Sequence, residues 1–419
     1  EKKNGVWQYY LYDGDGQLSA ISYKGGDYYY IRDNLRTITG LVDANGVAVV
    51  NYRYDSWGML TVITGSKFLS VPASVAAFAG RDGWLSMIIL FALDLLVLVC
   101  LLWSVRLNTN DKNLNDILEN CLSPVGARII YALLFLFYTI RQLDLMSATQ
   151  KVFSATLTLR TNWPGFALPL IALSVFVVIL GFRSLARVAE FIAGWVFFAA
   201  VAMLLFSLSK TDFTELLPIL ANGFTPVGTG ALNHTFFFTD SLFIIFLLSR
   251  IKKERKMFRS PITAFLIGAV ITILLYVVFY ALFGDIAWLQ DSAMPKVSQF
   301  NTTLTSNGRL DWLTVVIWLA AIFIKIILFF FCSVYSIAGF FRCKENQLHP
   351  LFLVFYSLLL LMLPLLLPVE AFTNDFFVLG AGKFILWIVQ YLLPFSLPVF
   401  TFLSNKKTSS VKEEMYVSI

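Results

Sequence analysis

Residues 227–249, VGTGALNHTFFFTDSLFIIFLLS, lead directly into RIKKERKMFR at residues 250–259. The first stretch is apolar and has no Lys or Arg, and the second is a cluster of cations. This order is typical of a membrane-spanning helix at the point where it emerges into the cytoplasm. Polar and glycine residues in the first half of the span weaken a regular helix in lipid. We therefore expect this span to unwind and to face protein or a water-lined cavity.

The composition of the whole chain agrees with a membrane protein. It has 419 residues, of which 58% are hydrophobic and 14% charged, and its mean hydropathy is +0.74. These values lie outside the range of soluble globular domains. The net charge of +6 does not indicate a nucleic-acid partner, because the cations gather in short loops beside apolar spans. The four cysteines show neither metal-ligand nor CxxC spacing.

Apolar segments from residue 84 onward predict a polytopic all-α domain. Each is long enough to cross a hydrocarbon core of about 30 Å. The shorter segment 67–80 precedes them, and we interpret it as the second half of a broken helix because it is too short to cross and contains Pro72. The predicted spans are 84–103, 125–149, 165–182, 185–208, 228–249, 261–283, 310–339, 350–367 and 378–403.

The charges of the connecting loops agree with a single topology. If the basic loop after residue 249 is cytoplasmic, the loops on its side are the cation-rich ones, and the opposite loops carry mainly carboxylates. This pattern predicts a cytoplasmic C-terminal tail at residues 405–419. The cations on the first side are Arg106, Lys112, Arg183, Arg187, Arg342, Lys344, Lys406, Lys407 and Lys412.

Residues 1–66 differ from the rest, because they contain an internal repeat. Tyr10, Tyr12, Asp13, Gly16, Leu18 and Ile21 recur at identical offsets as Tyr52, Tyr54, Asp55, Gly58, Leu60 and Ile63. Each copy predicts a β-hairpin, and DANG at 43–46 predicts a further turn. The repeat resembles the C-terminal YD repeats of Rhs-type proteins. We therefore expect a β fragment at 1–66 followed by a permease-like domain at 67–404.

Several motifs in the apolar part carry a second resemblance. LSVP (69–72), AGRDGWLS (79–86), TNWPG (161–165), GFRSLARVAE (181–190) and LLPILANGFTP (216–226) occur in the order of the GerAB-type spore germination permeases. That family lies within the amino acid/polyamine/organocation superfamily. The resemblance implies a LeuT-like fold of two inverted five-helix repeats whose first and sixth helices are broken. It also implies a spore inner membrane location, with an A-type membrane subunit and a C-type lipoprotein as partners.

The chain departs from this family pattern in two places. YD-repeat sequence stands where the first half of the first helix is expected, so that helix is predicted to be truncated. GMLTVITGS (58–66) is apolar enough to serve as a weak substitute for the missing half. In the sixth helix, Thr239 and Asp240 stand where the family suggests a small residue followed by an acidic one.

The two helix breaks supply the candidate substrate-binding residues. Asp240, with Phe238 and Thr239, lies where the sixth helix is expected to unwind and to expose backbone groups to a zwitterionic ligand or an ion. Ser70, Val71 and Pro72 form the matching break in the first helix, where a simple kink is an equal alternative. We also expect Tyr138, in the third helix, to line the cavity.

Four charged residues within predicted spans are candidates for ion pairing or coupling. Arg141 and Asp144 are three positions apart, so they lie on one helix face, where a structural pair is the simpler interpretation. Lys325 has no charged neighbour in its own helix and therefore needs a carboxylate or a path to water. Its possible partners are Asp94, Asp144 and Asp240. In LeuT-like proteins the eighth helix borders a sodium site, so the resemblance implies that Lys325 could replace that cation.

No pattern for an enzyme, a cofactor or a metal site emerges. The leading hypothesis is a germination permease that binds a nutrient, an amino acid, and either transports it or acts as a germinant-receptor subunit. One alternative is a YD-repeat polymorphic toxin whose C-terminal module inserts into membranes. Another is a non-functional joining of two gene fragments.

Overall fold

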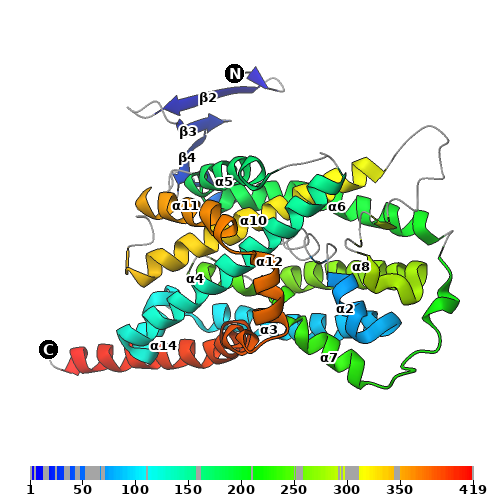
Figure 1. Ribbon diagram of the computed structural model, residues 1–419. Coiled ribbons are helices and arrows are strands. Elements are labelled where there is room, and N and C mark those ends of the chain that lie inside the picture. Colours follow the sequence, from blue (N-terminus) through cyan, green and yellow to red (C-terminus); the bar gives the residue numbers. More distant parts are fainter. Residues whose placement is uncertain are drawn as a thin grey trace. The chain divides into compact units, whose positions relative to one another are not determined.

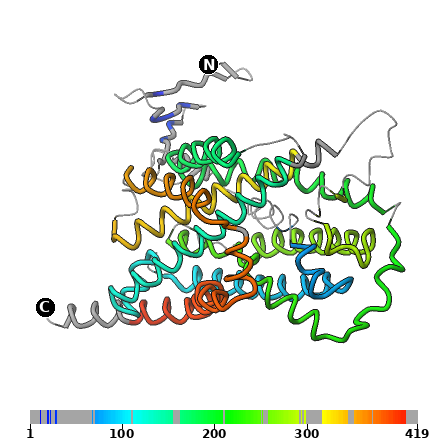
Figure 2. Tube along the Cα trace, in the orientation of Figure 1, coloured from blue at the N-terminus to red at the C-terminus, as the bar shows by residue number. Residues whose placement is uncertain are grey.

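The chain divides into two compact units, Glu1–Asp55 and Ser56–Ile419, in a computed structural model. Figure 2 follows the Cα trace of both. We consider each unit by itself. The residues that the structure describes are 2–3, 6–12, 18–23, 26–32, 38–42, 48–51, 67, 71–109, 112–156, 162–208, 211–249, 251, 258–290, 293, 296–297, 311–343 and 350–417.

The first unit is an antiparallel meander in which consecutive strands are neighbours. β2 and β3 pair with Tyr10 opposite Ile21, so they flank the turn of the first repeat copy. β5 and β6 pair with Leu41 opposite Val50, on either side of the DANG sequence. The second copy, at 52–63, lies outside the described residues. The strands are β1 (Lys2–Lys3), β2 (Val6–Tyr12), β3 (Leu18–Tyr23), β4 (Gly26–Arg32), β5 (Ile38–Val42) and β6 (Ala48–Asn51).

The secondary-structure elements described in the second unit are all helical (Figure 1). Its α-helices are α2 (Val71–Ala79), α3 (Gly83–Leu107), α4 (Leu114–Thr156), α5 (Trp163–Leu180), α6 (Phe182–Leu208), α7 (Thr225–Asn233), α8 (Arg259–Phe283), α10 (Asp311–Phe340), α11 (Pro350–Leu366), α12 (Val369–Phe372), α13 (Gly382–Trp387) and α14 (Leu393–Val417). Shorter 3₁₀ segments are η1 (Gly80–Asp82), η2 (Phe213–Leu216), η3 (Thr235–Phe237), η4 (Asp240–Leu247) and η5 (Gly284–Leu289), and π-helical segments are η7 (Thr373–Val378) and η8 (Ile388–Leu392).

Seven helices are long and apolar enough to cross a membrane, within the residues described. Each contains most or all of one predicted span. The predicted span 350–367 corresponds to the shorter apolar helix α11. The predicted span 228–249 is interrupted, as its polar content suggested, because α7 ends at Asn233 and η4 begins only at Asp240.

Backbone geometry at Thr239 marks this interruption. Its φ of 66° and ψ of 37° lie in the left-handed region, which a β-branched residue rarely adopts. Holding such a conformation costs on the order of 1–3 kcal/mol, so the surrounding contacts must maintain it. The break is therefore a defined structural feature of the sixth membrane segment.

One boundary was missed from the sequence. The predicted span 125–149 begins too late, because helical structure begins at Leu114. The helix bends at Ser123, where φ is 80°. Pro124 follows directly, and proline is well suited to the first turn of a new helix because it lacks an N–H. The result is a short helix before the kink and a long one after it.

The first described helix of the second unit and the interrupted sixth segment lie side by side. α2 packs against α7, and α3 packs against α7, η4, α8 and α14, while α10 lies between α4 and α6. Figure 1 shows α3 and α8 running next to each other. This arrangement places α3, α4, the break after α7 and α10 around one buried region.

Two tyrosines of α8 contact the backbone of Lys67 and of the first turn of α2. Tyr280 donates a hydrogen bond to the carbonyl oxygen of Pro72 at 2.8 Å, and Tyr276 donates one to the carbonyl oxygen of Lys67. Both tyrosines are fully buried. Each hydrogen bond joins a buried tyrosine hydroxyl to a backbone acceptor and so fixes this part of the chain to α8.

Gly83→Ala is expected to disturb this arrangement and to destabilise the fold by about 1–3 kcal/mol through overpacking. A Cβ at Gly83 would overlap the hydroxyl of Tyr280. Thermal unfolding in lipid nanodiscs measures the effect, and Gly194→Ala in α6 is the matched control, since its Cβ would meet no atom within 4 Å. Equal unfolding temperatures for the two variants would contradict the prediction.

Candidate binding site at the break of the sixth segment

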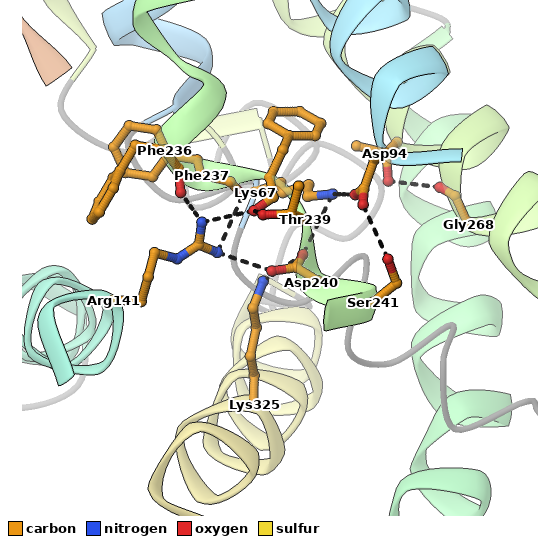
Figure 3. Close-up of polar contacts among 12 residues, drawn as sticks. Lys67, Asp94, Arg141, Phe236, Phe237, Thr239, Asp240, Ser241, Gly268 and Lys325 are labelled. Carbon is orange, nitrogen blue, oxygen red and sulfur yellow. Dashed lines mark hydrogen bonds and ion pairs between the residues drawn. The ribbon is translucent and has the colours of Figure 1, made fainter. Parts of the chain in front are cut away.

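Asp240 is the first residue of η4, and its carboxylate forms ion pairs with three cationic side chains. Its Oδ2 lies 2.8 Å from Nζ of Lys325 and 3.4 Å from Nζ of Lys67. Its Oδ1 accepts a hydrogen bond from Nη2 of Arg141 at 2.9 Å. Figure 3 shows the three cationic side chains converging on this carboxylate from different parts of the chain.

A second carboxylate, Asp94 of α3, completes the cluster. Nζ of Lys67 lies 3.2 Å from Oδ2 of Asp94, and Ser241 donates a hydrogen bond to Oδ1 at 3.4 Å. The Lys67 ammonium also lies 4.5 Å from the ring centre of Phe91 and 4.1 Å from that of Phe238. Lys67 thus bridges the two carboxylates while resting on two aromatic rings.

Arg141 of α4 binds the unwound backbone as well as Asp240. Nη1 donates to the carbonyl oxygens of Phe236 and, at 3.0 Å, Phe238, and Nη2 donates to that of Phe237 at 3.3 Å. We expected these backbone groups to be open to a ligand. The structure corrects this, because the guanidinium of Arg141 already occupies them.

The five charged side chains are shielded from water. Lys67, Asp94 and Lys325 have no exposed surface, and Asp240 and Arg141 are 2% and 4% exposed. Ion pairs of this kind contribute little net stability, but removing one partner leaves an uncompensated buried charge, which costs about 3–5 kcal/mol. Three cations face two carboxylates, so the cluster has one positive charge in excess when all five side chains are ionised.

Most of the charged residues singled out from the sequence meet here. Asp94, Arg141, Asp240 and Lys325 form one cluster. Of the three possible partners named for Lys325, the described ion pair is with Asp240. Arg141 pairs with the same carboxylate across the fold.

The remaining predicted residues lie at varying distances from the cluster. Phe238 contributes its carbonyl and its ring, and Thr239 provides the left-handed turn. Tyr138 is buried against Phe246 and Phe329, with ring centres 5.9 and 5.8 Å away.

The first-helix residues and Asp144 are placed differently. Val71 and Pro72 begin α2, four and five positions after Lys67, whereas Ser70 lies outside the described residues. Asp144 accepts a hydrogen bond from Thr373 at 3.1 Å.

Sequence reasoning missed two residues of the site. Lys67 was taken as the junction between two segments, although a single lysine at the start of an apolar broken helix is a signal for an intramembrane ion pair. Gln390 donates to the carbonyl oxygen of Thr235 at 3.0 Å. It lies in the π-helical segment η8, a type of distortion that occurs often at functional sites, and nothing in the sequence pattern indicates that distortion.

The described residues also bear on whether a metal site is present. No group of three or more His, Cys, Asp or Glu side chains lies close enough there to hold a metal ion. The carboxylates of the cluster are paired with the protein's own cations instead.

Comparisons with known proteins agree with this architecture. Spore germination protein XB of Bacillus anthracis is 25% identical over 269 residues, which cover 60% of this chain and 71% of that protein. Spore germination protein KB of Bacillus subtilis (strain 168) is 26% identical over 293 residues, covering 67% of this chain and 76% of that protein.

A solved structure shows the fold. The crystal structure of MhsT in complex with L-phenylalanine matches with a TM-score of 0.56 and 14% identity, covering 84% of this chain and 89% of that one. The likeness confirms the predicted LeuT-like arrangement of the membrane helices.

The family model described as "Spore germination protein" matches residues 59–370. The match begins eight residues before the boundary predicted at 67, and that boundary stays a prediction. The matched region contains α2 through α11 and all five charged residues of the cluster. The chain is therefore a multi-pass membrane protein that belongs to the family of spore germination proteins.

Proposed function

We propose that this protein binds a small nutrient, an amino acid, at the cluster around Asp240, and either transports it or passes the signal to partner subunits. The observation that carries the proposal is the buried ionic cluster at an unwound membrane segment. Inverted-repeat transporters place their substrate sites at such breaks, where backbone polar groups and charges are kept out of lipid.

The cost of the cluster supports a functional role. Five ionisable side chains within membrane segments are expensive to maintain, and such residues are a functional-site hypothesis by default. A purely structural cluster would be replaced at little cost by apolar residues of similar volume. Phe238, Thr239 and Tyr138 are proposed to line the site, with Ser70, Val71 and Pro72 on the first-helix side.

Several wider assignments are part of the same proposal. We propose an A-type membrane subunit and a C-type lipoprotein as partners, the spore inner membrane as the location, and a cytoplasmic C-terminus. The protein would act by binding or transport and not as an enzyme. Residues 1–66 would be a YD-repeat fragment that precedes the permease. The part of the chain that the structure describes contains no feature that favours the toxin alternative.

Ligand-induced stabilisation tests the proposal. The full chain is purified into nanodiscs, and its unfolding temperature is measured with each of the twenty amino acids, since a ligand that binds the folded state raises this temperature. We expect at least one amino acid to give a saturable rise.

The variant Arg141→Lys tests whether this stabilisation depends on the proposed site. It keeps the positive charge but loses the planar fork that binds the Phe236 to Phe238 carbonyls and Asp240. We expect it to abolish the ligand-induced rise, whereas the exposed Arg259→Lys keeps it. The proposal fails if no amino acid raises the unfolding temperature, or if Arg141→Lys responds like the unaltered protein.

A further inference from the structure

The charges of the cluster bear on which part of a ligand it recognises. Both oxygens of Asp240 are engaged by the protein's own cations, Oδ1 by Arg141 and Oδ2 by Lys325 and Lys67. Asp94 is engaged by Lys67 and Ser241. An incoming ammonium group or metal ion would therefore have to displace a lysine or arginine that is already buried and paired.

The backbone acceptors of the break are occupied in the same way. Arg141 donates hydrogen bonds to the carbonyl oxygens of Phe236, Phe237 and Phe238. Gln390 donates one to the carbonyl oxygen of Thr235. Free carbonyls at an unwound segment would favour a cation. Here the protein supplies that cation itself.

Positive charge, in contrast, is in excess among the five described side chains when all of them are ionised. Three fully or almost fully buried cations share two carboxylates. The three cations also contact the faces of aromatic rings, which stabilise a cation without neutralising its charge. Lys67 lies over Phe238, Arg141 lies 5.4 Å from the ring centre of Phe329, and Lys325 lies 5.6 Å from the same ring. A buried excess of positive charge is relieved by an anion.

We propose that the site recognises the carboxylate of its ligand through Lys67, Arg141 and Lys325, and that binding requires neither an ammonium group on the ligand nor an inorganic cation. The substrate class is then small carboxylates, amino acids among them, and excludes the corresponding amines. This inference rests on the proposed function only in placing the ligand at the same cluster.

Matched sets of analogues test the inference on the full chain in nanodiscs. The sets are L-alanine, propionate and ethylamine; L-leucine, 4-methylpentanoate and 3-methylbutylamine; and L-phenylalanine, 3-phenylpropionate and 2-phenylethylamine. Dissociation constants are measured in sodium chloride and in N-methyl-D-glucamine chloride. Within the set that binds, we expect the carboxylate to bind within tenfold of the amino acid and the amine not to bind. Replacing sodium should change the dissociation constant less than twofold.

The outcomes separate the two proposals. Binding of a carboxylate without any amino acid supports the charge inference and overturns the amino-acid function. Binding of an amino acid and its amine but not its carboxylate keeps the function and overturns the inference, as does a tenfold loss of affinity on removing sodium. If none of the nine compounds binds, the carboxylate inference is rejected, and the amino-acid function is decided by the measurement with all twenty amino acids.

Lys67→Met gives an independent measurement. It leaves two cations facing two carboxylates and so removes the excess charge. Because Asp94 loses its ion pair with Lys67, the amount of folded protein is measured in parallel. We expect the dissociation constant for the carboxylate to rise at least tenfold, whereas Lys151→Met, at an exposed position of α4, leaves it unchanged. An unaltered affinity in a folded Lys67→Met protein would overturn the proposed carboxylate contact.

Discussion

Asp240→Asn is expected to cause the largest loss of stability among single substitutions in the cluster, about 3–5 kcal/mol. The carboxylate is the common partner of Lys325, Arg141 and Lys67. An asparagine retains the shape but not the charge, so three cations would face Asp94 alone. Each of them is buried among helices and has no ready access to water.

A second substitution separates this electrostatic effect from lost packing. Lys325→Met in the Asp240→Asn background removes one of the buried cations that have lost their carboxylate partner. It should restore part of the lost stability, so the double-mutant cycle is expected to be non-additive. The measurement is the unfolding temperature and the yield of monodisperse protein in nanodiscs. Asp285→Asn is the matched control, because that carboxylate is 80% exposed in its pair with Arg81. An additive cycle, or no loss with Asp240→Asn, would show that charge pairing does not hold this region together.

Lys325→Met alone is expected to abolish uptake or signalling while the protein stays folded. Lys325 makes the shortest of the three contacts between a lysine or arginine and Asp240, at 2.8 Å. With methionine, Lys67 and Arg141 still balance the two carboxylates, so the loss concerns the site and not the fold. Methionine also fills a volume similar to that of lysine at this tightly packed position of α10.

Two readouts distinguish a functional from a structural role. Nutrient uptake into proteoliposomes, or the germination response of spores carrying the variant, is compared with the amount of folded protein in the same membranes. Lys151→Met serves as the exposed lysine control. If Lys325→Met supports normal uptake and a normal response, the proposed role of this ammonium is wrong. If folded protein disappears together with activity, the residue is structural.

The sequence indicated several members of the site because single charged residues in apolar segments stand out. Lys325 within AAIFIKIILFFF and Asp240 within an interrupted span could each be recognised from the cost of a charge in lipid. Their partners could not. Arg141 was expected to pair with Asp144, its neighbour on the helix, yet it binds Asp240, which is 99 positions away. Spacing along a helix predicts local pairs only, and this pair forms between elements.

Lys67 illustrates the same limit more sharply. Its position beside a change in composition suggested a boundary, and only the packing of α3, α8 and η4 around it shows that it bridges Asp94 and Asp240. Likewise, the break in the sixth segment was expected from its glycines and polar residues, but its carbonyls were expected to be open, and Arg141 occupies them.

By itself, the sequence determined that the chain is a multi-pass helical membrane protein, where most of its spans lie, and that the span 228–249 is interrupted. These properties follow from the local cost of exposing polar groups to lipid, which each segment bears independently. Only the tertiary structure decided which cation meets which carboxylate and what occupies the unwound backbone. Those contacts join elements far apart in the chain, and their geometry depends on how the helices pack.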